Sequence, residues 1–139
     1  MSIVLDASVA LLWLAPETNP QGVKYADAVL DKVEKSQALV PSLWHLEVAN
    51  AIARMEARGM VLEADSQCFI ALLQRLDIKT DLTTAEYALG DTLNLARRYK
   101  LSVYDAAYLE LALRTGHPLA TLDAELAKAA ALAGLAGCN

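Results

Sequence analysis

The sequence predicts an α/β fold, a three-layer sandwich in which helices flank a mainly parallel sheet. Short apolar runs alternate with longer segments whose apolar residues recur at helical spacing, and this order predicts βαβ units. The first run, Ile3-Val4-Leu5, is continuously apolar, which is typical of a strand buried on both faces. The 139 residues contain no repeat or low-complexity tract, so we expect a single domain over 1–139.

Apolar spacing and turn residues divide the first half of the chain. The predicted segments are a strand ending at Asp6, a short buried helix over 9–14, a helix opened by Pro20, a short strand over 38–40, a helix from about Ser42 to Arg58, and a helix from about Leu62 to Leu76. Pro16 stops the first helix, Pro41 ends the second strand, and Gly59 ends the long helix. Ser42 is expected to be the N-cap of that long helix.

The second half of the chain shows the same alternation of predicted strands and helices. The predicted segments are a weak strand centred on Ile78, a helix from Thr83 or Thr84 to Tyr99, a helix from Val103 to Thr115, a strand from Pro118 to Leu122, and an Ala-rich helix reaching Gly134. Gly116 stops the helix that begins at Val103. Leu135 and Ala136 are candidates for a terminal edge strand.

Composition limits the function classes. The net charge of −5 argues against a general nucleic-acid binder, which usually carries a basic surface. That argument weakens if four acids share one metal site, because the remaining acids then outnumber the basic residues by only one. The chain has no apolar stretch of about 18 residues and no basic region before its first apolar run, so we expect a cytoplasmic protein without a membrane span. Cys68 and Cys138 form no CxxC pair and are expected to be reduced thiols.

Four carboxylates stand out by their context. Asp6 and Asp123 end predicted strands, whereas Glu47 and Asp105 lie in the first turns of predicted helices. Strand ends and helix starts share one edge of a parallel sheet, so the fold allows the four to meet. Like charges at close range must either take up protons or bind a cation. Oxygen ligands without His or Cys favour Mg²⁺ or Mn²⁺, which can promote phosphodiester hydrolysis.

Each residue also has a purely structural interpretation. Asp6 and Asp123 could be caps, and Glu47 and Asp105 could be first-turn acids favoured by the helix dipole. The remaining acids, Glu110 and Glu125 among them, are assigned to the surface. Tyr104 and Tyr108 are assigned to the core or an interface rather than to base stacking.

Four motifs, taken in order, resemble the PIN domain, and in particular the VapC-type toxins of bacterial and archaeal toxin–antitoxin pairs. They are Ile3-Val4-Leu5-Asp6-Ala7-Ser8, the segment from Val40 to Asn50, Ser102-Val103-Tyr104-Asp105-Ala106-Ala107-Tyr108, and Leu119-Ala120-Thr121-Leu122-Asp123. The resemblance implies a parallel sheet sandwiched by helices and a metal-dependent endoribonuclease. It also implies a homodimer and a small antitoxin whose tail occupies the active-site groove.

When the functional residues of the family are matched motif by motif, the resemblance implies roles for seven residues of this sequence. The acidic metal site would be Asp6, Glu47, Asp105 and Asp123. Ser8 would support Asp6, and Asn50 and Thr121 would be supporting or substrate-side polar groups. Asp6 and Asp105 are the firmest ligand candidates, and a metal-bound water makes a protein nucleophile unnecessary.

Other functions remain open at this stage. One is a catalytically silent module that binds RNA or protein at the same edge. Another is a haloacid-dehalogenase-like hydrolase with Asp6 as nucleophile, although its phosphatase members place a second Asp where Ser8 stands. A receiver-type domain fits poorly, because Glu47 and Asp105 lie on helices. The segments 11–14 and 62–76 are candidate dimer interfaces.

Overall fold

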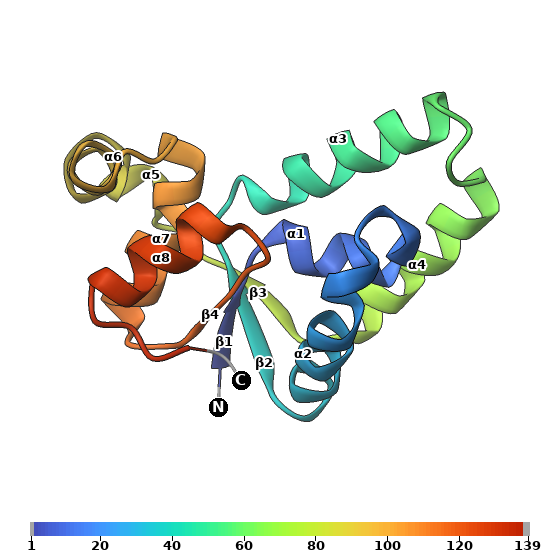
Figure 1. Ribbon diagram of the computed structural model, residues 1–139, viewed down its shortest axis with the longest axis horizontal. Helices are drawn as coiled ribbons and strands as arrows, with labels where there is room; N and C mark the ends of the chain where they lie inside the picture. The colour runs from blue at the N-terminus through green and yellow to red at the C-terminus, as the bar shows by residue number, and fades with distance from the viewer. Residues whose placement is uncertain (1, 138–139) are drawn as a thin grey trace.

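A computed structural model describes residues 2–137 and has a four-stranded parallel sheet at its centre. The strands are β1 (Ser2–Leu5), β2 (Gln37–Val40), β3 (Ile78–Thr80) and β4 (Leu119–Ala120). Their order across the sheet is β3-β2-β1-β4, and every pair is parallel (Figure 1). β1 is central, with Ile3 paired to Ala38 and Leu5 to Ala120. The α/β prediction is confirmed.

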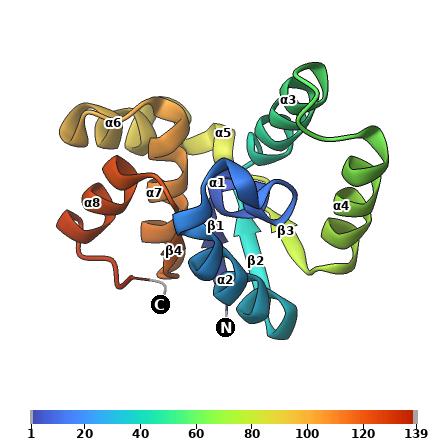
Figure 2. The same cartoon turned by 45° about the vertical axis from the view of Figure 1, so that its right-hand side comes forward.

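Helices cover both faces of this sheet. They are α1 (Ala7–Ala10), α2 (Val23–Lys35), α3 (Trp44–Ala57), α4 (Glu63–Arg75), α5 (Thr84–Tyr87), α6 (Leu93–Tyr99), α7 (Val103–Thr115) and α8 (Ala124–Leu132). In Figure 1 α1, α2 and α4 lie to the right of the sheet, and α6, α7 and α8 lie to its left. Figure 2, turned by 45°, shows α1 and α2 in front of the strands. In both figures α3 runs away from the sheet and α4 runs back toward it, so only the start of α3 lies near the sheet.

The core explains why the first strand is so apolar. Val4 and Leu5 are fully buried because helices pack on both faces of β1. α7 contributes the most continuous buried stretch, 106–112, and it lies against β1 and β4. Since β1 and α7 are fixed by this packing, residues at their ends have defined positions.

Several predicted boundaries are wrong. Ser42 is not the N-cap of α3: Leu43 holds that position without a side-chain cap, and the Ser42 amide instead donates to Thr84 Oγ1 at 3.1 Å. β4 is shorter than the predicted strand and covers only Leu119–Ala120; the hydroxyl of the next residue, Thr121, accepts from the Asp123 amide. Residues 135–136 form no strand, although Leu119 makes one parallel bridge to Gly137.

A further difference concerns the predicted helix that ends at Tyr99. A π-helical turn over Ala88–Thr92 interrupts that helix, so α5 and α6 are separate.

Cys68 is a free, exposed thiol, and Cys138 lies outside the described residues. None of the helices within residues 2–137 has the length and apolarity needed to span a membrane.

Candidate functional site

Asp6 lies where β1 ends, at the carboxyl edge of the sheet. Its backbone amide donates to the Ala120 carbonyl at 3.0 Å, which extends the pairing of β1 with β4 by one residue. The side chain is only 6% exposed, and it makes no cap hydrogen bond to α1. Asp6 thus occupies the N-cap position of α1, but capping alone does not account for its carboxyl group, which two hydroxyls also contact.

Two hydroxyls hold one oxygen of this carboxyl. Ser8 Oγ donates to Asp6 Oδ2 at 2.8 Å, and Thr121 Oγ1 donates to the same atom at 2.7 Å. Each hydroxyl also accepts from the backbone, Ser8 from the Leu122 amide at 3.1 Å and Thr121 from the Asp123 amide at 3.0 Å. Because both hydroxyl protons are thereby directed at Asp6, its carboxyl group has a fixed orientation.

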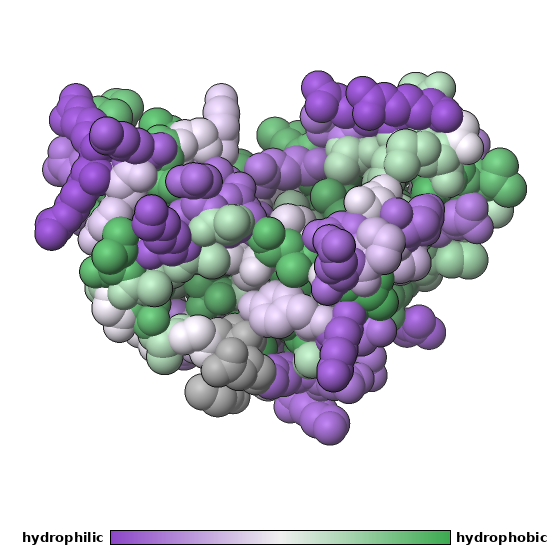
Figure 3. Space-filling model, in the orientation of Figure 1, coloured by the Kyte–Doolittle hydropathy of each residue, from purple (hydrophilic) through white to green (hydrophobic). Residues whose placement is uncertain are grey.

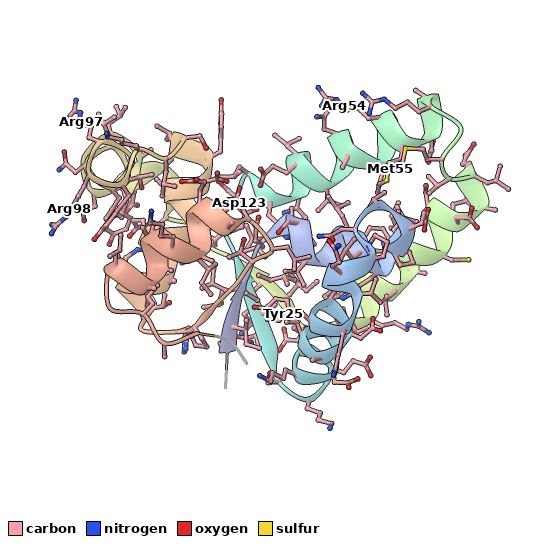
Figure 4. All side chains as sticks on the ribbon, viewed as in Figure 1. Tyr25, Arg54, Met55, Arg97, Arg98 and Asp123 are labelled. Carbon is pink, nitrogen blue, oxygen red and sulfur yellow. The ribbon has the colours of Figure 1, made fainter. Side chains whose placement is uncertain are left out.

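Asp123 does cap a helix. Its Oδ1 accepts from the amides of Glu125 and Leu126 at 2.9 and 3.1 Å, so it is the N-cap of α8. Figure 4 shows Asp123 at the turn into α8. The cap uses one carboxyl oxygen and leaves Oδ2 without a hydrogen bond among the described residues. Capping therefore does not prevent a second role.

Glu47 and Asp105 approach from two helices. Glu47 lies in the first turn of α3, where its Oε1 accepts a hydrogen bond from the buried hydroxyl of Tyr108 on α7. Asp105 lies in the first turn of α7, which begins with Ser102 as N-cap; Ser102 Oγ accepts from the Asp105 amide at 3.1 Å. Both carboxyl groups remain partly exposed.

The four acids influence one another electrostatically. Burial raises the pKa of Asp6, and the charge of Asp123 adds to this increase. Burial also raises the pKa of Glu47, and the charges of Asp6 and Asp105 add to it. For Asp105, burial raises the pKa and the charges of Asp123 and Asp6 raise it further. Four carboxyls from distant parts of the chain thus converge at one edge of the sheet.

The donor chemistry of this cluster fits a hard divalent cation. All the donors are carboxyl oxygens, which suit Mg²⁺ or Mn²⁺, and a cation would offset the mutual repulsion. Within residues 2–137, however, no three His, Cys, Asp or Glu side chains are arranged to hold a metal ion together. The cluster has suitable ligands, but metal binding would require the carboxyls to draw closer.

Asn50 remains a candidate substrate-side group, whereas the two tyrosines differ in part from the prediction. Asn50 is exposed, one turn beyond Glu47, and in the described part of the chain its side chain makes no hydrogen bond. Tyr108 is buried as predicted, but its bond to Glu47 makes it part of the site. Its position one turn after Asp105 could have indicated this. Tyr104 is 66% exposed, so it does not belong to the core.

Glu110 is not a surface residue, contrary to the prediction. It is 4% exposed, and its carboxylate accepts two hydrogen bonds from Arg114, which also pairs with Asp81 at 2.6 Å. The spacing of four residues between Glu110 and Arg114 could have predicted their ion pair on one helix face, but it does not by itself indicate that Glu110 is buried. Glu125 is exposed, as predicted.

The raised pKa values predict how pH affects stability without metal. An acid with a raised pKa binds its proton more readily in the folded state, so stability falls as pH rises from its ordinary value near 4 through the raised value. In EDTA we expect urea unfolding to give a smaller unfolding free energy at pH 8 than at pH 5. Asp6→Asn should lose part of this slope, by about 1.4 kcal/mol for each pKa unit. Identical slopes in the two proteins would contradict the interpretation.

Comparisons with known proteins agree with this geometry. The family model described as PIN domain matches residues 3–132. Ribonuclease VapC3 of Pyrobaculum aerophilum is 30% identical over 129 residues, which cover 92% of this chain and 94% of that protein. The crystal structure of PAE2754 from the same organism matches with a TM-score of 0.65 and 25% identity, covering 93% of this chain and 87% of that one.

Proposed function

Because the chain belongs to the PIN-domain family, we propose that it is a metal-dependent endoribonuclease and the toxin of a toxin–antitoxin pair. One observation carries the proposal: four carboxyls converge at the carboxyl edge of the sheet, and the pKa values of Asp6, Glu47 and Asp105 are raised by burial and mutual repulsion. Such perturbed acids are typical of functional sites. The similarity to a ribonuclease supports RNA as the substrate.

The proposed roles follow from the surroundings of each acid. Asp6 and Asp105 would hold Mg²⁺ or Mn²⁺, with Asp123 and Glu47 completing the site. Ser8 and Thr121 keep the Asp6 carboxyl oriented through their hydrogen bonds. A bound cation would supply activation of water and stabilisation of phosphate oxygens. Glu47 is the best candidate to accept a proton from the attacking water, because its raised pKa brings it closer to neutral pH.

Three polar side chains on one face of α3 form a row along which a single strand of RNA can bind. Glu47, Asn50 and Arg54 are three and four residues apart, so they lie on one face of the helix. Arg54 is exposed about 10 Å along the axis from Glu47, and within the described residues its guanidinium makes no ion pair. Figures 3 and 4 show hydrophilic side chains along this outer side of α3, with Arg54 pointing away from the body. We propose that Asn50 and Arg54 contact the RNA backbone.

Arg54→Ala should therefore weaken RNA binding without affecting catalysis. We expect KM for an oligoribonucleotide to rise about fivefold, with kcat and Mn²⁺ affinity unchanged. The slope of log K against log salt should decrease by about one, as for the loss of one phosphate contact. Arg75→Ala, at the exposed end of α4, is the matched control. Equal KM values for the two variants would remove Arg54 from the binding surface.

We also propose a homodimer and an antitoxin partner in the cytoplasm. The support is the similarity to VapC3 and several exposed apolar side chains. Leu82 and Leu89 are 90% and 88% exposed, whereas the predicted interface 11–14 is largely packed against the core. On α4, Ile70 is exposed, in keeping with 62–76 as an interface. Sedimentation equilibrium of the purified chain tests the dimer.

The function is tested by titrating Mn²⁺ and Mg²⁺ calorimetrically while following cleavage of total cellular RNA. We expect metal binding, discrete RNA products, and loss of cleavage in EDTA. Asp105→Asn should lose both binding and cleavage. Asp31→Asn, an exposed acid on α2, should retain both. RNA binding without metal dependence and without cleavage would instead favour a silent binding module.

A further inference from the structure

A second acid follows a strand at the same edge of the sheet. Asp81 comes directly after β3, as Asp6 does after β1, but Asp81 is paired with a cation of the protein itself. Arg114 Nη2 contacts Asp81 Oδ2 at 2.6 Å, and the hydroxyls of Thr83 and Thr84 donate to Asp81 at 2.8 and 3.0 Å. Burial alone would raise the pKa of Asp81, but these hydrogen bonds together lower it. The surrounding donors therefore favour the charged form of Asp81.

Arg114 is itself fixed on α7. Its Nε donates to Glu110 Oε2 at 2.8 Å and its Nη2 to Glu110 Oε1 at 3.1 Å, one turn earlier on the same helix. Its guanidinium also lies 4.2 Å from the centre of the Tyr87 ring. A planar group held on two sides and one face has little rotational freedom. Asp81 is consequently held at a defined position relative to α7.

The contacts continue from Asp81 to the beginning of α3. Thr84 donates its hydroxyl proton to Asp81 Oδ2, and its oxygen accepts from the backbone amide of Ser42 at 3.1 Å. Ser42 lies two residues before α3 and five before Glu47. A chain of hydrogen bonds thus runs from Arg114 on α7 through Asp81 and Thr84 to the segment that carries Glu47.

A separate contact joins the same two helices inside the site, where Tyr108 on α7 donates to Glu47 on α3. The helices are therefore tied together twice, although α3 mostly projects away from the sheet (Figure 1). Resting on the proposed function, we infer that Arg114, Asp81 and Thr84 are positioning residues that set Glu47 relative to Asp105. They touch neither substrate nor metal, and they act by holding the start of α3 against α7.

Thr84 offers the cleanest test, because its hydroxyl can be removed without changing charge. Thr84→Val removes the hydrogen bonds of the hydroxyl to Asp81 and Ser42, and Thr84→Ser keeps the hydroxyl. With Mn²⁺ and a fluorogenic mixed-sequence oligoribonucleotide, we expect Thr84→Val to lower kcat about tenfold with KM within twofold. Amide exchange of residues 42–47 should become about tenfold faster. Thr84→Ser should return both quantities to within twofold of wild type. If Thr84→Val does not fold, Thr84→Ala replaces it.

Two results with the Thr84 variants would overturn the inference. If Thr84→Val lowers only the melting temperature and leaves kcat and the exchange of 42–47 unchanged, the link does not position Glu47. Equal impairment of the Val and Ser variants would also overturn it, because the hydroxyl would then not matter. If the wild-type chain cleaves no RNA, the proposed function fails, and the exchange comparison still decides whether the link holds α3.

Discussion

Asp6→Asn is expected to abolish divalent-metal binding and to reduce RNA cleavage about a thousandfold, equivalent to about 4 kcal/mol of transition-state stabilisation. Asp6 is the most buried of the four acids, and its orientation is set by Ser8 and Thr121. Asn has the same shape and can still accept from both hydroxyls, so the variant removes the charge and keeps the geometry. Calorimetric Mn²⁺ titration and cleavage of a labelled oligoribonucleotide measure the two effects.

The control for this result is stability. The variant removes a buried charge that other acids repel, so in EDTA at neutral pH it should unfold at the same temperature as wild type or a higher one. A folded Asp6→Asn protein with full cleavage, after repeated purification, would show that the carboxyl cluster is not the active site. Thr121→Val should give a smaller loss, because it disturbs the orientation of Asp6 without removing its charge.

Arg114→Met is expected to destabilise the fold by about 3–5 kcal/mol, the usual cost of removing one partner from a buried ion pair. The variant would leave two carboxylates unpaired, since the side chains of Glu110 and Asp81 are only 5% and 11% exposed. The pKa of Asp81 is lowered in the folded state, so its contribution is present above an unfolded pKa near 4 and is lost as pH falls through the folded value. Urea unfolding at pH 7 measures the effect.

A double variant separates lost pairing from lost packing. Glu110→Gln combined with Arg114→Met removes the most buried unpaired charge, so it should recover part of the lost stability. The interaction energy from the double-mutant cycle should then be well above zero. A loss below about 1 kcal/mol in Arg114→Met alone would mean that water reaches both carboxylates and that the cluster is an ordinary surface pair.

Local patterns predicted the elements well, and they predicted the candidate acids through topology. Parallel strands end at one edge of the sheet, so the sequence predicts that Asp6 and Asp123 can lie close together. In the structure both residues lie at this edge. Long-range polar contacts could not be predicted in this way. Arg114 meets Asp81 across 33 positions, and neither periodicity nor composition indicates that pairing.

Errors at helix starts have a similar cause. Ser42 has the composition of an N-cap, but its amide bonds to Thr84, 42 residues away, and Leu43 becomes the cap residue. Tertiary contacts override a local preference worth about 1 kcal/mol. The apolar residues around Tyr108 in the sequence predict a core or interface position, and its ring is buried. They do not indicate that its hydroxyl donates to Glu47.

The contact between Thr121 and Asp6 has a consequence for synthesis of the chain. These residues are 115 positions apart, and Ser8 depends in the same way on the amide of Leu122, 114 positions further on. Chains emerge from the ribosome with their N-terminal part first. The Asp6 carboxyl therefore cannot acquire its hydrogen bond from Thr121 until nearly the whole polypeptide has been translated. A nascent or truncated chain ending before β4 would therefore lack the assembled carboxyl cluster.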